Sequence, residues 1–372
     1  MLDSYLPVYV NDSCVSKHKR HNYSKVMFIL AITLVMICAI MLITWCWNIL
    51  IFKSHVNSFP FTPPKHTCKG LRYKIGIVSD LDALSGVGMV GTWFSHFKTG
   101  YLTIDIPRKK AYIEMDNGTT TNLYTNFSSG DSGMGLSELI WFDENLLAVD
   151  DLTGIIYIID EKKAYPWVIL ADGHGKVSGH GFKGEWATVK DGLLYVGSTG
   201  KVWTNAKGEV LNRYRQWVKT ISPKGLVRHH DWTENYKLLA KSVNTEHPGY
   251  LVHEACAWSN IHQKWVFLPR RWSNLSYNEK DDGSRGTNLV LIANENFSRI
   301  KVKHIDKVNP SRGFSSLKFI PGSNDDWIVA LKSEELEGKT ATYIMVFTMN
   351  GNIILSETQI SSKYKFEGIE FI

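Results

Sequence analysis

The sequence predicts an all-β protein, a five-bladed β-propeller, preceded by one N-terminal transmembrane helix. Three observations support this prediction. An uncharged, mostly apolar run covers residues 26–52. From Leu71 onward, short β-rich runs alternate with turns, and hardly any helical pattern is present. The strand–turn–strand pattern recurs over a few dozen residues, which is typical of meander units packed radially around an axis.

The apolar run at residues 26–52 is longer than the ~20 residues that a helix needs to cross a bilayer. The basic residues before it are Lys17, Lys19, Arg20 and Lys25. Only Lys53 follows closely, so the positive-inside rule places residues 1–25 in the cytosol as a short tail. A cleaved signal peptide is disfavoured because the run is long and starts late. The sequence thus predicts a signal anchor and a type II, single-pass membrane protein.

The remainder of the chain is expected in the lumen of the Golgi or the endoplasmic reticulum. Surface presentation, or secretion after cleavage, is an alternative that the sequence leaves open. Four N-x-S/T sequons support a glycoprotein, and they begin at Asn117, Asn126, Asn274 and Asn296. Residues 53–70 contain three prolines and are predicted to form a stalk, and residues 71–372 to form the propeller.

Charge and cysteine content narrow the class of protein. Of the net charge of +6, residues 54–372 keep only +3, from 37 basic and 34 acidic residues. This balance argues against nucleic acid as a partner. Cys68 and Cys256 are the cysteines beyond the membrane segment, and the sequence does not decide whether they pair. Assembly as a homodimer is likewise compatible with the sequence and undecided by it.

The repeat can be followed in the letters. "LIWFDENLLAVDDLTGIIYII" predicts three strands joined by turns. "WATVKDGLLYVGSTGKVWT" repeats it, with a third strand expected at residues 202–204. "ACAWSNIHQKWVFLPRR" and "SLKFIPGSNDDWIVALKS" repeat the first two strands. Roughly 300 residues at ~60 per unit give about five blades. A β-sandwich is the competing architecture, but it does not repeat in this way.

A polar residue recurs just before the apolar part of each first strand. These residues are Glu138, Glu185, Glu254, Ser315 and Glu367. First strands line the channel of a propeller, so equivalent positions form a ring around its axis. Four carboxylates in one ring repel each other unless a cation lies among them. Oxygen-only ligands in a wide ring favour Ca²⁺ over Zn²⁺ and Mg²⁺. The alternative is a set of solvated acids at strand ends.

Gly86-Val87-Gly88-Met89-Val90-Gly91 matches the G-x-G-x-x-G pattern of dinucleotide-binding folds. That pattern requires a strand directly before the glycines and a helix directly after them. Here six residues separate the strand from the first glycine, and a strand-like segment follows. The glycines are therefore expected to form a loop near the tunnel entrance.

The sequence resembles the calcium-activated nucleotidase family, which includes soluble and type II membrane apyrases. The resemblance spans residues 71–372 and rests on long stretches such as "IVSDLD", "VDDLTGIIY", "GFKGEW", "PGYLVHEACAWS", "GFSSLKFIP" and "FEGIEFI". It implies a five-bladed propeller with Ca²⁺ in its central tunnel. It also implies hydrolysis of nucleoside di- and triphosphates (UDP, GDP, ADP, ATP) to lower phosphates plus orthophosphate. The calcium ligands implied are Ser137, Glu138, Glu185, Glu254, Ser315 and Glu367. Leu152 and Ala255 depart from the residues usual in the family.

Hydrolysis of a polyphosphate needs carboxylates that position water and cations that bind phosphate. The candidate catalytic residues follow two strands, and they are Asp80, Asp82, Asp150 and Asp151. Turn formation through the side chain is the alternative role for each. The candidate substrate-binding residues are Arg270, Lys98, Lys201 and Trp93. A non-enzymatic, calcium-stabilised binding module is the rival function, and only the enzyme requires the aspartates.

Overall fold

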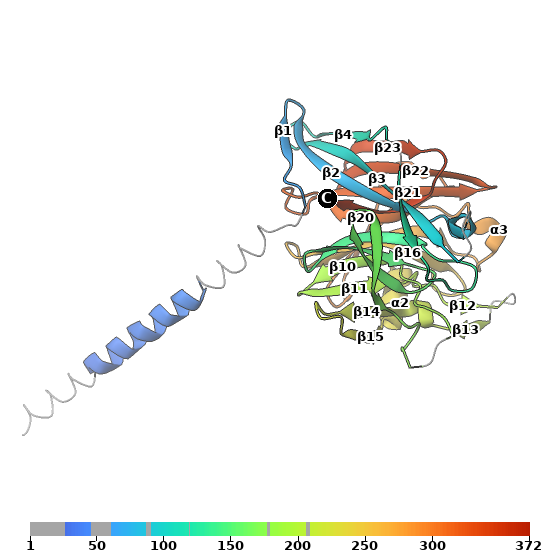
Figure 1. Ribbon diagram of the computed structural model, residues 1–372. Coiled ribbons are helices and arrows are strands. Elements are labelled where there is room, and N and C mark those ends of the chain that lie inside the picture. Colours follow the sequence, from blue (N-terminus) through green and yellow to red (C-terminus); the bar gives the residue numbers. More distant parts are fainter. Residues whose placement is uncertain (1–26, 46–60, 87–90, 119, 177–178, 206–208) are drawn as a thin grey trace, which may run out of the picture. The chain divides into compact units, whose positions relative to one another are not determined.

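The computed structural model describes residues 27–45, 61–86, 91–118, 120–176, 179–205 and 209–372 (Figure 1). The chain divides into two units, one ending at Phe59 and one beginning at Pro60. In the first unit, the helix Met27–Trp45 is 19 residues long and apolar enough to span a membrane. The predicted cytosolic tail, both ends of the predicted span and residues 53–60 of the predicted stalk lie outside the described residues.

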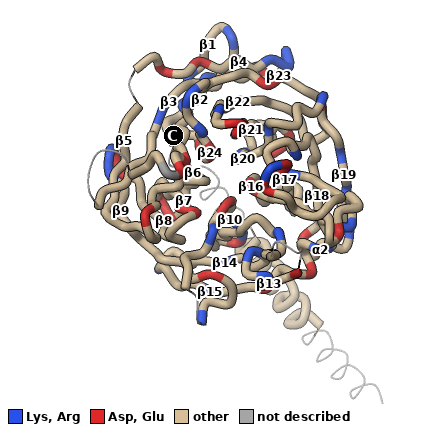
Figure 2. Tube along the Cα trace, turned by 90° about the vertical axis from the view of Figure 1, so that its right-hand side faces the viewer, with Lys and Arg blue, Asp and Glu red and all other residues tan. Residues whose placement is uncertain are grey.

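Beyond Pro60, the described residues form five antiparallel blades around a common centre (Figure 2). Blade 1 contains β6 (Leu136–Phe142), β7 (Asn145–Asp150), β8 (Ile155–Asp160) and β9 (Lys163–Ile169). Blade 2 contains β10 (Trp186–Lys190), β11 (Leu193–Gly197), β14 (Trp217–Ile221) and β15 (Val227–Asp231). Blade 3 contains β16 (Tyr250–Ser259), β17 (Lys264–Ser273), β18 (Leu289–Asn294) and β19 (Ile300–His304). Blade 4 contains β20 (Arg312–Phe319), β21 (Trp327–Leu336), β22 (Lys339–Thr348) and β23 (Ile353–Ser361).

The fifth blade joins the two ends of the propeller. Its strands are β24 (Phe366–Phe371), β2 (Gly70–Ser79), β3 (Trp93–Asp105), β4 (Lys110–Met115), β5 (Thr121–Thr125) and β1 (Lys65–Thr67). The C-terminal β24 pairs with β2, with Ile369 opposite Ile77. β1 also pairs with β2, so part of the predicted stalk belongs to this blade. The innermost strands β6, β10, β16, β20 and β24 surround the centre (Figure 2). The predicted five-bladed propeller is confirmed.

The hydrophobic core lies between the blades. The described residues form five buried clusters, and each cluster draws on two neighbouring blades. Between blades 2 and 3, for example, Trp186 of β10 packs near Trp265 and Phe267 of β17. Because each blade is covered on both faces, its inner strands are buried on consecutive residues, as in β6 and β7. This ring of interfaces holds the inner strands in fixed positions.

Turn chemistry sets the hairpins within the blades. β10 and β11 are joined by Asp191 and Gly192, and both have positive φ, 52° and 71°. Two-residue hairpins need this left-handed backbone, which Asp-Gly adopts readily.

The prediction that residues 202–204 form the third strand of blade 2 is wrong. β12 (Trp203–Thr204) pairs instead with β13 (Val210–Asn212) in a separate hairpin, and β14 takes the third place.

Few helices interrupt the described blades. They are α2 (Thr233–Ser242), α3 (Glu279–Asp282) and the 3₁₀ turns Asp82–Gly86 and Tyr214–Gln216. β2 and β3 are antiparallel neighbours, so the glycine motif between them does not belong to a parallel dinucleotide-binding unit. Residues 87–90 of that motif lie outside the described residues.

Cys68 is exposed and Cys256 is buried in β16. Both are free, so they do not form a disulfide here.

We expect residues 60–372 to fold without the N-terminal helix, because the propeller closes on itself through β24 and β2. A shorter fragment, residues 71–372, should melt at a lower temperature. It loses β1 and Phe61, whose ring lies 6.2 Å from that of Phe371. Thermal unfolding followed by circular dichroism compares the two fragments. Equal melting temperatures, or an insoluble 60–372 fragment, would contradict this account.

Candidate active site

The innermost strands carry the same irregularity at the same level of the propeller. In four of them the pairing with the second strand skips one residue. The skipped residues are Ser137 in β6, Glu254 in β16, Ser315 in β20 and Glu367 in β24. In blade 2 the corresponding residue is Glu185, whose N–H donates to the Gly197 carbonyl at 2.8 Å. A β-bulge of this kind re-aims a side chain, so repeating it brings these five positions to one end of the inner strands.

In the first blade this position differs from the prediction by one residue. The bulge falls on Ser137, and Glu138 enters a different set of contacts. Glu138 Oε1 accepts a hydrogen bond from Ser316 Oγ at 2.8 Å and lies 3.1 Å from Lys318 Nζ. Lys318 Nζ also lies 3.9 Å from a carboxylate oxygen of Glu370. Complete burial raises the pKa of Glu138 to about 7.

Arg270 lies between two of the bulge carboxylates. Its Nη1 donates to Glu254 Oε2 at 2.5 Å and to Glu367 Oε1 at 2.7 Å. Its Nη2 lies 3.7 Å from Glu335 Oε2. The side chain of Arg270 is only 7 % exposed. This residue was predicted to bind substrate phosphate, but its contacts make it the internal counter-ion of two acids from different blades.

Lys365 plays the same role for the predicted catalytic pair. Its Nζ lies 2.7 Å from Asp80 Oδ2 and 2.9 Å from Asp82 Oδ2. Glu335 and Glu367 also lie within 4.0 Å of it. Burial opposes ionisation of Asp80, but the ion pair with Lys365 lowers the pKa of this carboxyl. Burial and the neighbouring Asp80 charge raise the pKa of Asp82.

Lys183 completes the group, with an ion pair to Asp151 and a 3.1 Å contact to Glu185 Oε1. Asp151 is buried, and its Oδ1 has no hydrogen-bond partner among the described residues. Burial raises its pKa well above the usual range, and the Asp80 and Glu185 charges add to the effect. The aspartates after β2 and after β7 therefore share one site, although they are about 70 residues apart in the chain.

Taken together, these groups define a carboxylate cluster of described residues at one end of the tunnel. Its acids are Asp80, Asp82, Asp151, Glu185, Glu254, Glu335 and Glu367, and its cations are Lys183, Arg270 and Lys365. Seven acids face three cations, so full ionisation leaves four negative charges in excess. Burial raises the pKa of Glu254 to about 8, and the nearby Glu185 and Glu367 charges add to this. The cluster therefore favours additional positive charge.

Asp150 has a different role from its neighbour Asp151. Its Oδ1 accepts the backbone N–H groups of Leu152 and Thr153, at 2.9 and 3.2 Å. Its Oδ2 accepts the N–H of Met134 at 3.1 Å. Both oxygens are thus used to hold the turn after β7, which is the structural alternative considered for these aspartates. Its contacts do not support a catalytic role.

The other predicted substrate-binding residues are dispersed. Lys98 lies within β3 opposite Ile77 and has no part in the ion pairs of the carboxylate cluster. Trp93 donates its indole N–H to the Asp131 carbonyl at 3.2 Å, so its polar atom is already used. Lys201 follows β11 at the same end as the cluster, with its Nζ 3.1 Å from the ring centre of Tyr277. Burial lowers the pKa of Lys201 to about 8.

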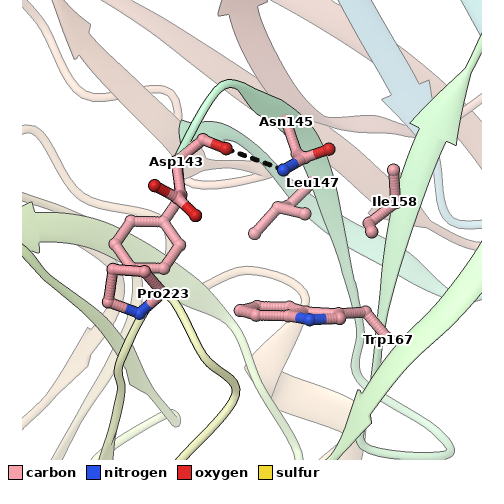
Figure 3. Close-up of a pocket in the computed structure, with 7 residues that line it drawn as sticks. Asp143, Asn145, Leu147, Ile158, Trp167 and Pro223 are labelled. Atoms are coloured by element: carbon pink, nitrogen blue, oxygen red, sulfur yellow. Dashed lines mark hydrogen bonds between the residues drawn. The ribbon is translucent and has the colours of Figure 1, made fainter.

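A small pocket lies elsewhere, beside the β6–β7 hairpin (Figure 3). Its lining residues are Phe142, Asp143, Asn145, Leu147, Ile158, Trp167 and Pro223. Phe142 ends β6, whereas Ser137 lies near its start, so the pocket and the carboxylate cluster are at opposite ends of the strand. The lining contains no basic side chain, and Asn145 donates to the Asp143 carbonyl at 2.7 Å within the turn. It does not suit a polyphosphate.

The sequence reasoning missed Lys183, Lys365 and Glu335. A local signal was available for the two lysines, because Lys183-Gly-Glu185 and Lys365-Phe-Glu367 both read K-x-E. In extended backbone, residues two apart point to the same side. A lysine two residues before a ring glutamate is therefore expected to point toward the same channel as that glutamate. Glu335 offers no such signal, because it reaches the cluster from the far end of β21.

A propeller whose acidic centre collects aspartates and glutamates from different blades suggests a metal-assisted hydrolase. Comparison with known families matches residues 81–372 to the apyrase family. The chain is 47 % identical over 320 residues to soluble calcium-activated nucleotidase 1 of Mus musculus, covering 86 % of this chain and 79 % of the mouse protein. Apyrase apy-1 of Caenorhabditis elegans is 42 % identical over 322 residues, covering 86 % and 90 %. The apyrase of Cimex lectularius is 41 % identical over 323 residues, covering 86 % and 88 %.

The chain belongs to the apyrase family, and the resemblance found in the sequence is confirmed. It is therefore a nucleotide-hydrolysing enzyme, and the rival function of a non-enzymatic binding module is set aside.

We expect Asp150→Asn to destabilise the fold by about 1–3 kcal/mol, because its amide would place N–H donors against backbone N–H groups. The folded fraction should hydrolyse nucleotides at the wild-type rate, since both Asp150 oxygens accept backbone N–H groups of the turn. Denaturant unfolding and activity per folded molecule measure the two effects. A stable variant without activity would show that Asp150 takes part in the chemistry.

Proposed function

We propose that this enzyme hydrolyses nucleoside diphosphates and triphosphates, of the UDP, GDP, ADP and ATP class, to lower phosphates plus orthophosphate, and that Ca²⁺ is required. The observation that carries the proposal is the carboxylate cluster, with its excess of acids over cations at one end of the tunnel. The relatives of this chain include a protein named as a calcium-activated nucleotidase, which supports the choice of cation.

The residues present fit a calcium ion, although they do not form a closed cage. Among the described residues, no group of three or more His, Cys, Asp or Glu side chains is gathered closely enough to hold a metal. The glutamates are instead held by Arg270, Lys183 and Lys365. Three oxygens in the proposed ligand set have no hydrogen-bond partner in the part of the chain that the structure describes, and these are Ser137 Oγ, Ser315 Oγ and Glu138 Oε2. Buried polar atoms without partners are rare unless an ion or water satisfies them.

Calcium would then be held by Ser137, Glu138, Glu185, Glu254, Ser315 and Glu367, a set of oxygen donors only. A divalent cation bound there supplies positive charge to phosphoryl oxygens. The chain's own part is to orient water and to keep charges in place. Asp80 and Asp151 lie beside the proposed ligands through Lys365 and Lys183, and we assign them to position the attacking water.

The helix Met27–Trp45 fits a signal anchor or a signal peptide. We propose that it is an anchor and that the propeller lies in the lumen of the Golgi or the endoplasmic reticulum. The asparagines of the four sequons, Asn117, Asn126, Asn274 and Asn296, are exposed, which is compatible with glycosylation there. Thr119 of the first sequon lies outside the described residues. Calcium sites of the extracellular type bind at roughly 10⁻⁴–10⁻³ M, which suits compartments of high calcium.

The proposal is tested by phosphate release from a panel of nucleotides with and without Ca²⁺. Glu185→Gln and Glu367→Gln should abolish the calcium-dependent rate and the calcium-dependent rise in melting temperature, because each removes one ligand charge and keeps the shape. Glu114→Gln is the matched control, since Glu114 pairs with Arg72 at the surface. Wild-type rates in both ring variants at millimolar Ca²⁺ would exclude the ring as the calcium site.

Asp80→Asn and Asp151→Asn should lower kcat roughly 10²–10⁴-fold, the usual range for lost acid–base assistance. Both variants should keep the calcium-dependent shift in melting temperature, because neither residue is a proposed ligand. Asp160→Asn, an exposed change at the end of β8, serves as the control. Should the two variants hydrolyse nucleotides normally, the aspartates would be turn residues and the catalytic assignment would be wrong.

A further inference from the structure

Arg271, next to Arg270 in β17, is a buried cation whose hydrogen bonds are not made. The residue is 3 % exposed, and its Nε and Nη1 have no hydrogen-bond partner among the described residues. The nearest carboxylate oxygen recorded for it is Asp282 Oδ2, 3.7 Å from Nε. This separation is beyond hydrogen-bond distance. The guanidinium is therefore held near a carboxylate without being bonded to it.

Such an arrangement is costly and needs an explanation. A buried charge is tolerated only when it is paired and hydrogen-bonded. Arg312, which is less buried, is paired by hydrogen bonds to Glu334 at 3.2 Å and to Glu357 at 2.9 Å. Arg270 is paired as well, through Glu254 and Glu367. A buried arginine that leaves two donor nitrogens unused is ready to receive an anion that the described protein does not supply.

A glycine and a shared acid lie beside Arg271. A side-chain carbon at Gly313 would lie 2.4 Å from Arg270 Cγ, 2.6 Å from the Arg270 carbonyl oxygen and 3.0 Å from Arg271 Nη1, so only glycine fits against the two arginines. Asp282 is already engaged, because its Oδ1 accepts the hydroxyl of Tyr250 at 2.7 Å. The Asp282 charge also acts on the ammonium of Lys201, so one acid serves two cations.

Arg271 directly follows Arg270 of the carboxylate cluster in β17. The charges of Arg270, Asp282, Glu254 and Glu335 all act on its guanidinium. In a complex of a nucleoside diphosphate with a divalent cation, the positive metal lies beside the negative phosphoryl groups. The carboxylates match its cation, and Arg271 with Lys201 matches its phosphoryl groups.

We propose that Arg271, and not Arg270, is the arginine that binds a phosphoryl group of the nucleotide, with Asp282 as its loose counter-ion when no anion is bound. This inference rests on the proposed function for the identity of the anion. Arginine is suited to the role because its planar guanidinium offers several donors in fixed directions. The neighbouring arginine cannot serve as readily, because its Nη1 already donates to Glu254 and to Glu367.

Orthophosphate is the probe, and the purified full chain is used throughout. Phosphate should raise the melting temperature of the wild type. In Arg271→Gln this shift should be lost, and the inhibition constant of phosphate against nucleotide hydrolysis should rise at least about tenfold. KM for a nucleoside diphosphate should rise more than kcat falls, and Arg271→Lys should restore part of the affinity. Arg72→Gln, which removes a surface arginine, should behave as the wild type.

Asp282→Asn provides the test that does not depend on losing Arg271. The amide oxygen can still accept the Tyr250 hydroxyl, but the charge that competes with phosphate is removed. Phosphate should therefore bind this variant more tightly than the wild type. A merely structural Arg271 would lower stability in Arg271→Gln and leave phosphate binding unchanged in both variants. If Arg271→Gln fails to fold, Arg271→Lys and Asp282→Asn decide the question.

The outcomes separate this inference from the proposed function. Full hydrolysis by the wild type, with unchanged phosphate binding in Arg271→Gln or in Asp282→Asn, would overturn the role of Arg271 alone. Absence of a phosphate-induced shift in the wild type would overturn it as well. The wild type could also hydrolyse no nucleotide and yet bind phosphate, with this binding lost in Arg271→Gln. That result would exclude the proposed function and support the anion site at Arg271.

Discussion

The last strand of the chain, β24, pairs with β2 from the beginning of the propeller, and both the fold and the site depend on this pairing. It completes the fifth blade and so converts a row of four blades into a closed ring, in which every blade packs between two neighbours. The same strand carries Glu367, while β2 leads into Asp80. Closure therefore brings a proposed ligand and a proposed catalytic residue to the same place, although they come from opposite ends of the propeller sequence.

All of the candidate chemistry lies at one end of the tunnel for a topological reason. In an antiparallel blade, the start of the first strand and the end of the second strand meet at the same edge. The bulge residues come from the first strands, and Asp151, Arg270, Arg271 and Glu335 come from the ends of second strands or just beyond. Glycine keeps the centre narrow. A side-chain carbon at Gly368 would lie 2.6 Å from the Leu139 backbone nitrogen, so only glycine lets β24 and β6 approach.

Lysine and arginine within the carboxylate cluster change how a cation would be bound. Lys183, Arg270 and Lys365 tie each glutamate to a basic partner, which lets like charges from separate blades coexist in the closed ring. The same partners would compete with the proposed calcium ion for these oxygens, and they keep the acids apart when no calcium is bound. The excess of acids over bases is what leaves a place for a divalent cation.

Much of the fold and part of the site could be predicted from the sequence, because they depend on local patterns. Strand alternation and turn residues indicated the blades, and the recurrence of Glu185, Glu254, Ser315 and Glu367 at strand starts indicated a ring. For blade 1 the same recurrence pointed to Glu138, whereas the bulge falls on Ser137, and such a one-residue bulge decides which side chain faces the centre. Only the tertiary structure separated Arg270 from Arg271, which are identical in type and adjacent in the chain. The first meets Glu367, which is 97 residues away, and is neutralised, while the second meets no acid within hydrogen-bond distance. Contacts between distant segments determine which charges are paired, and a local pattern does not contain them.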